Sequence, residues 1–396
     1  MAPSKDIDMK NEMEKANRDF SGLVPSKKLA LVFGGTFVGV GGMFEYGRAW
    51  LDQLRGTGWN VSVIASLQVL AALGESQELA IDSSEETTLN YRQIALASVL
   101  GVGAAKRLLG AVVKSIDLSG VDAIHIVDRA LFSAFLAKGV RKRFPKVVTI
   151  VTIHDPTWHE ERIACSAKIL KARDDRMLSK MAEKNEIWIH VHAKQLTLGS
   201  VFQGVRNLIA VDHPAPLARV VRVRREIQRS LVSSGAVFPI RMGFVGRIEP
   251  YKGLDVFLEG LISLIEKQPE VAGKIEVLIA GRGNIDQGLV ARVVCPLIIR
   301  NEFIEDLEFH QLVADLDLLV LPYKSATQSG VAMLGLTYRI PLIVTNVGGL
   351  PLLVLDGVTG YVMKHQGGQV LELLLARLMK NPELLGEMRG NMGSAN

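Results

Sequence analysis

Residues 243–253 read Gly-Phe-Val-Gly-Arg-Ile-Glu-Pro-Tyr-Lys-Gly, and their pattern decides the fold of the second half of the chain. A short apolar run at residues 242–245 ends at Gly246, and apolar residues at helical spacing follow the segment. We therefore predict a strand joined to a helix by a tight loop. Arg247 and Lys252 lie in this loop, where an open α/β sheet binds anionic ligands. We interpret them as a diphosphate clamp; a solvated surface pair is the alternative.

The same alternation of strand and helix recurs along the chain. Apolar runs rich in β-branched residues lie at 29–33, 61–65, 123–127, 147–153, 187–191 and 208–211, and again at 242–245, 275–280, 316–321, 342–345 and 361–363. Helical patterns lie between them, for instance at 43–54 and 131–143. Uninterrupted apolar runs are typical of parallel strands covered on both faces. The fold class predicted is α/β, with two doubly wound Rossmann-like domains facing across a cleft.

Length and composition fit two domains of similar size. The 396 residues are 48% hydrophobic and 22% charged, as in a well-packed enzyme. The predicted parts are a flexible leader at 1–27, a first Rossmann-like domain at 28–215, a linker at 216–236 and a second Rossmann-like domain at 237–396. Prolines at 214 and 216 and five arginines within residues 219–229 mark the boundary. We interpret those arginines as a solvated face, with a phosphate or membrane grip as the alternative.

Charge and cysteine usage narrow the function. The net charge of +5 is compatible with anionic substrates but lacks the dense footprint of a nucleic-acid-binding protein. Cys165 and Cys295 have no metal-ligand spacing and favour a reducing compartment. No apolar run reaches spanning length; residues 94–105 are predicted as a buried helix, with an interfacial helix as the alternative. We expect a cytoplasmic protein, with peripheral contact at the inner face of the membrane left open.

The first domain carries a glycine-rich turn and a histidine at strand ends. Residues 33–43 read Phe-Gly-Gly-Thr-Phe-Val-Gly-Val-Gly-Gly-Met, which suits a ligand approaching the backbone at a helix start but equally a plain structural turn. They do not form the dinucleotide fingerprint. His154 follows the strand at 147–153, where its imidazole could hydrogen-bond a sugar hydroxyl or assist proton movement. Core or rim positions are predicted for His125, His190 and His192.

The second domain carries further phosphate-suited loops. Residues 323–328 form a polar loop after a strand, and Ser329 is a good N-cap for the helix that follows. The amides of Gly330 and Val331 would then be free to donate to an anion. A second glycine loop, Thr-Asn-Val-Gly-Gly-Leu-Pro, occupies residues 345–351. Each loop alone could be turn chemistry, but three such elements at strand ends of one sheet favour a phosphate-bearing ligand.

Together these motifs resemble a GT-B glycosyltransferase of family 4, the retaining, bacterial polysaccharide-type glycosyl transferase group 1. The resemblance covers roughly residues 28–379 and is more specific in the second half. There it rests on Gly246-Arg-Ile-x-x-x-Lys-Gly, Ala280-Gly-Arg-Gly, Asp317-Leu-Leu-Val-Leu-Pro-Tyr, Ser329-Gly, Val347-Gly-Gly-Leu-Pro and Asp356-Gly-x-Thr-Gly. In the first half it rests on Gly41-Gly-Met-x-x-Tyr, Ile153-His-Asp and His213-Pro.

The resemblance implies a retaining transfer of a hexosyl-type sugar from a UDP- or GDP-sugar to a glycan or lipid-linked acceptor, in polysaccharide biosynthesis of the cell envelope. It implies that the domain at 28–215 binds the acceptor and that the domain at 237–396 binds the nucleotide sugar. It also implies no metal and no cofactor besides the donor. Arg247 and Lys252 would stabilise the leaving diphosphate, and His154 would face the sugar. Donor contacts would come from Gly41, Gly42, Gly246, Gly281, Thr327, Gln328, Ser329, Gly330 and Val331.

The chain departs from the family pattern at two places. Thr327 and Gly335 stand where the family has two glutamates, so this is a Gln-Ser-Gly variant in which Gln328 or Thr327 is expected to take over the sugar contact. Residues 380–396 show no long amphipathic pattern, so the closing crossover helix of the family is not expected. The alternative function is a catalytically weak or inactive GT-B protein that binds nucleotide sugar or a partner. An epimerase or phosphorylase is disfavoured, because no acid/base carboxylate pair or cofactor lysine is evident.

Overall fold

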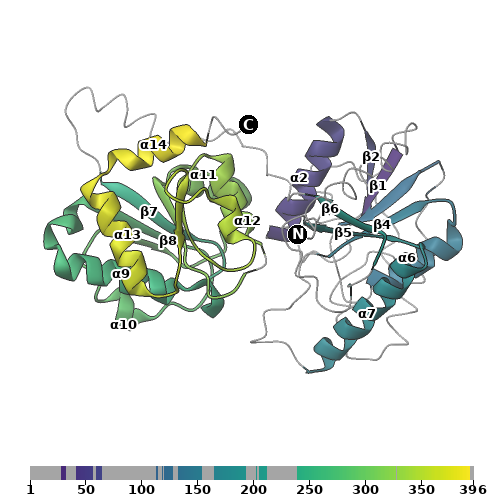
Figure 1. Ribbon diagram of the computed structural model, residues 1–396, viewed down its shortest axis with the longest axis horizontal. Helices are drawn as coiled ribbons and strands as arrows, with labels where there is room; N and C mark the ends of the chain where they lie inside the picture. Colours follow the sequence, from purple (N-terminus) through teal and green to yellow (C-terminus); the bar gives the residue numbers. More distant parts are fainter. Residues whose placement is uncertain are drawn as a thin grey trace, which may run out of the picture. The chain divides into compact units, whose positions relative to one another are not determined.

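The computed structural model divides into two compact units, Met1–Pro214 and Ala215–Asn396, each built on one sheet (Figure 1). The residues that it describes are 28–32, 42–56, 59–64, 113–114, 118, 120–127, 133–153, 165–192, 202, 205–211, 239–326 and 328–392. The predicted leader, the linker at 216–236 with its arginines, and the apolar run at 94–105 lie outside these residues.

Unit 1 contains a six-stranded parallel sheet with strand order β2-β1-β3-β4-β5-β6. Its strands are β1 Lys28–Val32, β2 Asn60–Ile64, β3 Ala123–Ile126, β4 Val148–Thr152, β5 Trp188–His192 and β6 Leu208–Val211. The longer helices described are α2 Gly42–Gly56, α6 Ser133–Arg143 and α7 Cys165–Glu183. Each predicted strand of this half is present, with its ends shifted by two residues at most.

Both faces of this sheet are covered, which explains why its strands are apolar throughout. Leu31 and Val63 pack with Tyr46 of α2 on one face. The next residues along the same strands, such as Val32, belong to a separate cluster with α6 and α7 that includes Leu178. Because neighbouring strand residues point to opposite faces, an α/β sheet with helices on both sides needs apolar residues at every position.

The strand histidines of unit 1 lie in the interior, as predicted for His125 and His190. Their rings are 4% and 2% exposed. Nε2 of His125 and Nδ1 of His190 lie 2.7 Å and 2.8 Å from Oγ1 of Thr152, so one hydroxyl joins them. Trp50 makes edge contacts with both rings. These histidine side chains are therefore packed in the core on this face of the sheet.

Unit 2 also contains a six-stranded parallel sheet, with strand order β12-β11-β10-β7-β8-β9. Its strands are β7 Ile240–Val245, β8 Ile275–Ala280, β9 Leu297–Arg300, β10 Leu318–Leu321, β11 Leu342–Thr345 and β12 Gly360–Met363. Its helices include the short η4 Pro250–Lys252, α9 Leu254–Lys267, α10 Gln287–Val290, α11 Asp306–Ala314, α12 Gly330–Thr337, α13 Gly368–Lys380 and α14 Glu383–Asn391. The predicted α/β fold class is confirmed in both units.

The sequence analysis missed one strand, β9. It lies at the edge of the sheet, next to β8. Ile298 and Ile299 are exposed there, at 37% and 36%. A four-residue edge strand between a proline and charged residues lacks the long apolar run that marks the buried strands.

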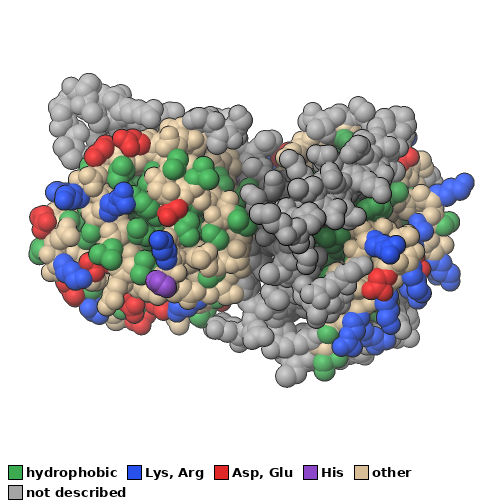
Figure 2. Space-filling model, in the orientation of Figure 1, with side chains coloured by type: hydrophobic (Ala, Val, Ile, Leu, Met, Phe, Trp, Pro, Cys, Tyr) green, Lys and Arg blue, Asp and Glu red, His purple; other side chains and the backbone are tan. Residues whose placement is uncertain are grey.

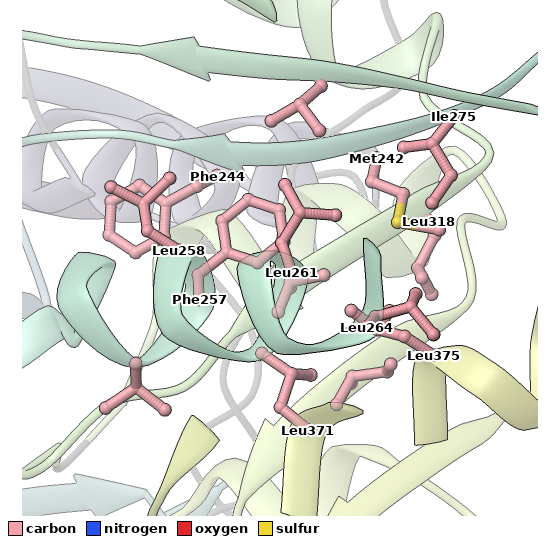
Figure 3. Packing of buried hydrophobic residues seen from close by; sticks show 14 of the residues in the cluster. Met242, Phe244, Phe257, Leu258, Leu261, Leu264, Ile275, Leu318, Leu371 and Leu375 are labelled. Atoms are coloured by element: carbon pink, nitrogen blue, oxygen red, sulfur yellow. The ribbon is translucent and has the colours of Figure 1, made fainter. Parts of the chain in front are cut away.

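Helices α9 and α13 cover one face of this sheet. They pack closely because Gly260 of α9 lies against Gly368 of α13. Phe257 of α9 stacks on Phe244 of β7 with ring centroids 6.5 Å apart, and Leu371 and Leu375 of α13 extend the same cluster (Figure 3). A Cβ added at Gly260 would lie 2.9 Å from the carbonyl oxygen of Gly368. The two helix backbones therefore approach more closely than larger side chains allow.

Residues Glu383–Asn391 form the nine-residue helix α14, in the segment where the sequence predicts no long amphipathic helix. Leu385 and Met388 of α14 are buried in the core of unit 2. Arg389 lies 3.7 Å from the carboxylate of Asp317. This segment is thus part of the packed unit. Within the residues described, no helix is both long and apolar enough to cross a membrane.

Helix α12 packs tightly over β10 and β11 at Gly335, one of the positions where the family pattern has glutamate. A Cβ added there would lie 2.8 Å from Leu342 and 2.9 Å from Leu319. Any side chain at this position points into the sheet. A carboxylate at Gly335 would therefore be buried among leucines rather than presented to a ligand.

We predict that Gly335→Glu lowers the free energy of unfolding by roughly 3 kcal/mol or more, since it overpacks the core and buries a charge. Gly386→Glu is the matched control, because Gly386 lies on helix α14 with nothing within 4 Å of an added Cβ. Urea unfolding of the two variants measures the difference. Equal midpoints would contradict the packing described for Gly335.

Glu372 of α13 provides a pH-dependent tie between α13 and α9. Its carboxylate lies 2.5 Å from Nζ of Lys267 and accepts a hydrogen bond of 2.9 Å from Ser263. The Lys267 hydrogen bond, more than any other contact, lowers the pKa of Glu372 below its ordinary 4.5. The stabilisation is therefore present above about pH 4.5 and is lost as the pH falls through the lower folded-state pKa.

We predict that Glu372→Gln destabilises the protein most near pH 7 and that the difference from wild type shrinks as the pH falls from about 5 to 3. Glu270→Gln, at an exposed glutamate, serves as the control. Urea midpoints measured across this range test the prediction. A difference that stays constant with pH would show that the charge of Glu372 contributes nothing.

Candidate functional site

The motif-bearing loops of unit 2 meet where the strand order of its sheet reverses. β7 and β10 are neighbours, with Met242 beside Leu318, and the sheet continues to β8 on one side and β11 on the other. The chain leaves the carboxyl ends of β7 and β10 toward helices on opposite faces of the sheet. Open α/β sheets bind ligands at such a switch point, so the geometry selects this end of the sheet.

Glycines let the loops after β7 and β8 touch backbone to backbone. Gly246 has φ of 103° and donates its N–H to Ala280 at 2.9 Å. Gly281 has φ of 134°, and a Cβ added there would lie 2.1 Å from the carbonyl oxygen of Gly246. Both positions thus need glycine.

Lys252 is buried, which excludes for this residue the alternative of a solvated surface charge. It is 8% exposed and ends the short helix η4. Its Nζ would lie 3.2 Å from a Cβ added at Gly246, and it lies 5.4 Å from the ring centroid of Tyr323. Burial lowers the pKa of Lys252, and the positive charge of Arg247 lowers it further, whereas Tyr251 and Glu249 act in the opposite direction.

Arg247 completes a pair of cations on the loop after β7. Its side chain is exposed, and among the residues that the structure describes it forms no ion pair. The positive charge of Arg247 contributes to lowering the pKa of Lys252. The two residues therefore form a local excess of positive charge that an anion would relieve.

The start of helix α12 lies beside this pair. Ser329 caps the helix by accepting a hydrogen bond of 3.2 Å from the amide of Ala332. The amides of Gly330 and Val331 have no protein partner among the described residues. Val331 reaches to 3.1 Å from a Cβ added at Gly246, so the two loops meet. Two free amides at a helix N-terminus add to the positive field of Arg247 and Lys252.

Tyr323 is a site residue to which the sequence analysis assigned no role. Its ring is 2% exposed and lies under Nζ of Lys252. Its hydroxyl lies 3.4 Å from Oγ of Ser329, and its carbonyl accepts a hydrogen bond of 2.6 Å from Thr345. Burial raises the pKa of Tyr323 to about 12. It therefore remains neutral at physiological pH and links the lysine, the helix cap and β11.

Lys324, the next residue, fastens the loop after β10 to the loop after β7. Its amide donates to the carbonyl of Tyr251 at 2.6 Å, and its Nζ lies 2.6 Å from the carboxylate of Asp255 in the first turn of α9. A Cβ added at Gly253 would lie 2.1 Å from the carbonyl oxygen of Pro322. Both loops are thus held in one fixed arrangement.

The structure brings one group of the predicted site residues together, describes two others individually, and does not describe the remaining three. Brought together in unit 2 are Gly246, Arg247, Lys252, Gly281, Ser329, Gly330 and Val331. Gln328 is half-buried directly before Ser329, and Gly42 begins α2 in unit 1. Outside the described residues lie Gly41, His154 and Thr327. In the part of the chain that is described, no group of three or more His, Cys, Asp or Glu side chains could hold a metal ion.

Comparison with known proteins gives this unit a family likeness. Residues 239–381 match the family model described as glycosyl transferases group 1. D-inositol 3-phosphate glycosyltransferase of Streptomyces scabiei is 27% identical over 239 residues, which cover 57% of this chain and 51% of the relative. The Streptomyces griseus enzyme of the same name is 30% identical over 155 residues, covering 37% of this chain and 33% of the relative. The chain thus spans about half or less of the length of these relatives.

Solved structures extend the likeness over the whole fold. HepE of Anabaena, solved in complex with UDP, aligns with 92% of this chain and 93% of its own at a TM-score of 0.61 and 13% identity. Sucrose-phosphate synthase of Thermosynechococcus elongatus aligns over the same shares at a TM-score of 0.62 and 15% identity. At such low identity the likeness shows the fold alone. The chain therefore shares with these structures a fold of two Rossmann-like domains, and residues 239–381 of its second unit are similar to glycosyl transferases group 1.

Proposed function

We propose that the protein is a glycosyltransferase that moves a hexosyl-type sugar from a nucleotide-diphosphate sugar to an acceptor with retention of configuration. The observation that carries the proposal is the buried Lys252, set beside Arg247 and the free amides of α12 at the switch point of a parallel sheet. A buried ammonium that has a second cation nearby and no ion pair among the described residues is costly unless an anion binds, even though Glu249 favours its charged form. A diphosphate carries the negative charge that such a site would bind.

The chemistry follows from where negative charge develops. As the bond between the sugar and the diphosphate breaks, charge accumulates on the leaving phosphate oxygens. Lys252 and the amides of Gly330 and Val331 are held in place before the reaction, so they stabilise this charge without reorganising, and the exposed Arg247 adds a second positive charge. Each such donor contributes on the order of 3 kcal/mol to lowering the barrier. In this proposal the protein cations stabilise the negative charge on the leaving diphosphate, as a metal ion does at other diphosphate sites.

The donor and acceptor are inferred from the fold and the relatives. We infer a UDP- or GDP-sugar as donor, supported by the UDP that is bound in the HepE structure. We infer a glycan or lipid-linked acceptor in cell-envelope polysaccharide synthesis, with His154 facing the sugar. Because the matched relatives are named D-inositol 3-phosphate glycosyltransferases, we include D-inositol 3-phosphate among the acceptors to be tested.

A second function is favoured by one specific observation, the loss of both family carboxylates. Position 335 is closed by Leu319 and Leu342, and the other position holds Thr327. Neither of these two positions therefore supplies a carboxylate to hold the sugar or the ribose. Gln328 would have to replace the first glutamate in contacting the sugar. Under this alternative the protein binds a nucleotide sugar but does not turn it over.

The proposal predicts release of a nucleoside diphosphate from one donor in a panel of UDP-, GDP- and ADP-sugars, with glycan, lipid-linked and inositol phosphate acceptors. Arg247→Ala and Lys252→Ala should each lower this release by about a hundredfold or more, because each removes a charge that stabilises the leaving group. Lys274→Ala, at an exposed lysine, is the matched control. Thermal unfolding checks that all three variants fold.

The outcomes separate the two functions. Binding of a nucleotide sugar without release under every acceptor would overturn the transferase and support the binding protein. Full activity in the Arg247 and Lys252 double variant would remove the clamp from the mechanism.

Tyr323 supplies a further test through the pH profile. Tyr323→Leu removes the ring beneath the Lys252 ammonium, so the pKa of Lys252 should fall further and activity should be lost at a lower alkaline pH. Tyr323→Phe keeps the ring and loses only the contact with Ser329, so its alkaline limb should stay near that of wild type. Initial rates between pH 6 and 10 compare the two. Identical limbs in both variants would show that the ring does not support the charged lysine.

A further inference from the structure

Helices α6 and α7 of unit 1 lie side by side and turn basic side chains outward. Figure 2 shows Lys and Arg side chains gathered over the part of unit 1 where Figure 1 places these helices, with little acidic colour among them. Unit 2 in the same view carries both signs interspersed. In this view the described basic side chains of unit 1 gather over α6 and α7, and we call this surface the α6–α7 face.

The cations of α7 form one stripe. Arg173, Arg176 and Lys180 are exposed at spacings of three and four residues, which puts them on the same side of the helix, and the exposed Lys184 follows its end. Ile169 begins the same stripe one turn earlier and is 69% exposed. From Arg173 to Lys184 the stripe is roughly 16 Å long. It is therefore longer than a site for a single phosphate group.

Helix α6 adds cations and no acidic residue. Lys138 and Lys142 are exposed at a spacing of four residues, and Lys146 is exposed in the turn that follows the helix. Arg143 is exposed too, although its guanidinium also donates to the carbonyls of Val113 and Lys114. The α6–α7 face is defined by these residues together with the α7 stripe.

The acidic residues of α7 do not neutralise this face, because two of the three are turned inward. Asp174 and Asp175 are 4% and 5% exposed. Asp174 accepts a hydrogen bond of 3.0 Å from the amide of Ala134 at the start of α6, where a carboxylate also suits the helix dipole. Glu183 alone is exposed on α7, and it accepts a hydrogen bond from Ser179. Among the described residues, the outward cations of α7 therefore form no ion pair with a carboxylate of this helix.

We propose that the α6–α7 face binds an anionic lipid bilayer. An extended row of cations that begins with an exposed isoleucine suits a surface with anionic headgroups above an apolar layer. A single-stranded nucleic acid is less suited, since the exposed described residues of the face include no aromatic side chain on which a base could stack. The inference depends on unit 1 alone, so it stands or falls separately from the transferase reaction.

The full chain should cosediment with phosphatidylcholine vesicles that contain about a third phosphatidylglycerol, and not with phosphatidylcholine alone. Because each cation near such a surface contributes about fivefold to partitioning, the variant R173Q/R176Q/K180Q/K184Q should bind several hundredfold more weakly. Ile169→Ser should weaken binding by a smaller factor. Raising the salt concentration should weaken binding of the wild type.

The control variant K274Q/R292Q/K364Q/K380Q removes the same number of exposed cations from unit 2. It should bind the anionic vesicles as the wild type does, while circular dichroism checks that both variants fold. The proposal is overturned if the α7 variant binds like wild type, or if the unit 2 control loses binding equally. It is also overturned if the wild type binds duplex DNA or single-stranded RNA more tightly than the anionic vesicles at the same ionic strength.

Discussion

The burial of the Lys252 ammonium is the constraint on which the candidate site depends. A charge that is 8% exposed loses most of its hydration, and the neighbouring Arg247 makes its position still less favourable. The face of Tyr323 lies beside the ammonium, and Tyr251 and Glu249 also favour its charged form, but burial outweighs them and the pKa of Lys252 is lowered. The rest of unit 2 holds the lysine in this costly place, and the free amides of α12 add to the same positive field. A site organised in this way is complementary to a multiply charged anion before the anion arrives.

Holding that charge in place requires backbones to approach closely, which explains the glycines better than flexibility does. The Gly246 carbonyl fills the space in which a Cβ of residue 281 would lie, and the Pro322 carbonyl does the same at Gly253. These contacts join the loops after β7, β8 and β10 into one rigid structure. The ion pair between Lys324 and Asp255 closes the arrangement from the outside. The position of Lys252 is therefore fixed by backbone contacts that involve three strands.

Much of the fold could be predicted from the sequence, since strands covered on both faces carry an unmistakable apolar pattern. The exception, β9, lies at an edge where Ile298 and Ile299 face solvent, so the pattern fades. At the site, the sequence identified Arg247, Lys252 and the cap of α12 from their places at strand ends. It could not predict that Lys252 is buried, because a lysine in a loop is more often exposed. Nor could it assign Tyr323, whose contacts with Lys252, Ser329 and Thr345 arise only when separate loops meet.

The two units illustrate that the position of a charge matters more than its amount. The net charge of +5 is modest, and it indicates neither a diphosphate site nor a charged face. In unit 2 the informative cation is the buried Lys252. Because its ammonium has lost contact with water, binding an anion there is more favourable than it would be at an exposed lysine. In unit 1 the informative residues are the acidic ones withdrawn from water, Asp174 and Asp175, since their burial leaves the outward lysines and arginines of α7 unbalanced. Under the two proposals, a small multiply charged anion would bind beside Lys252 in unit 2, and an extended anionic surface would bind along α6 and α7 in unit 1.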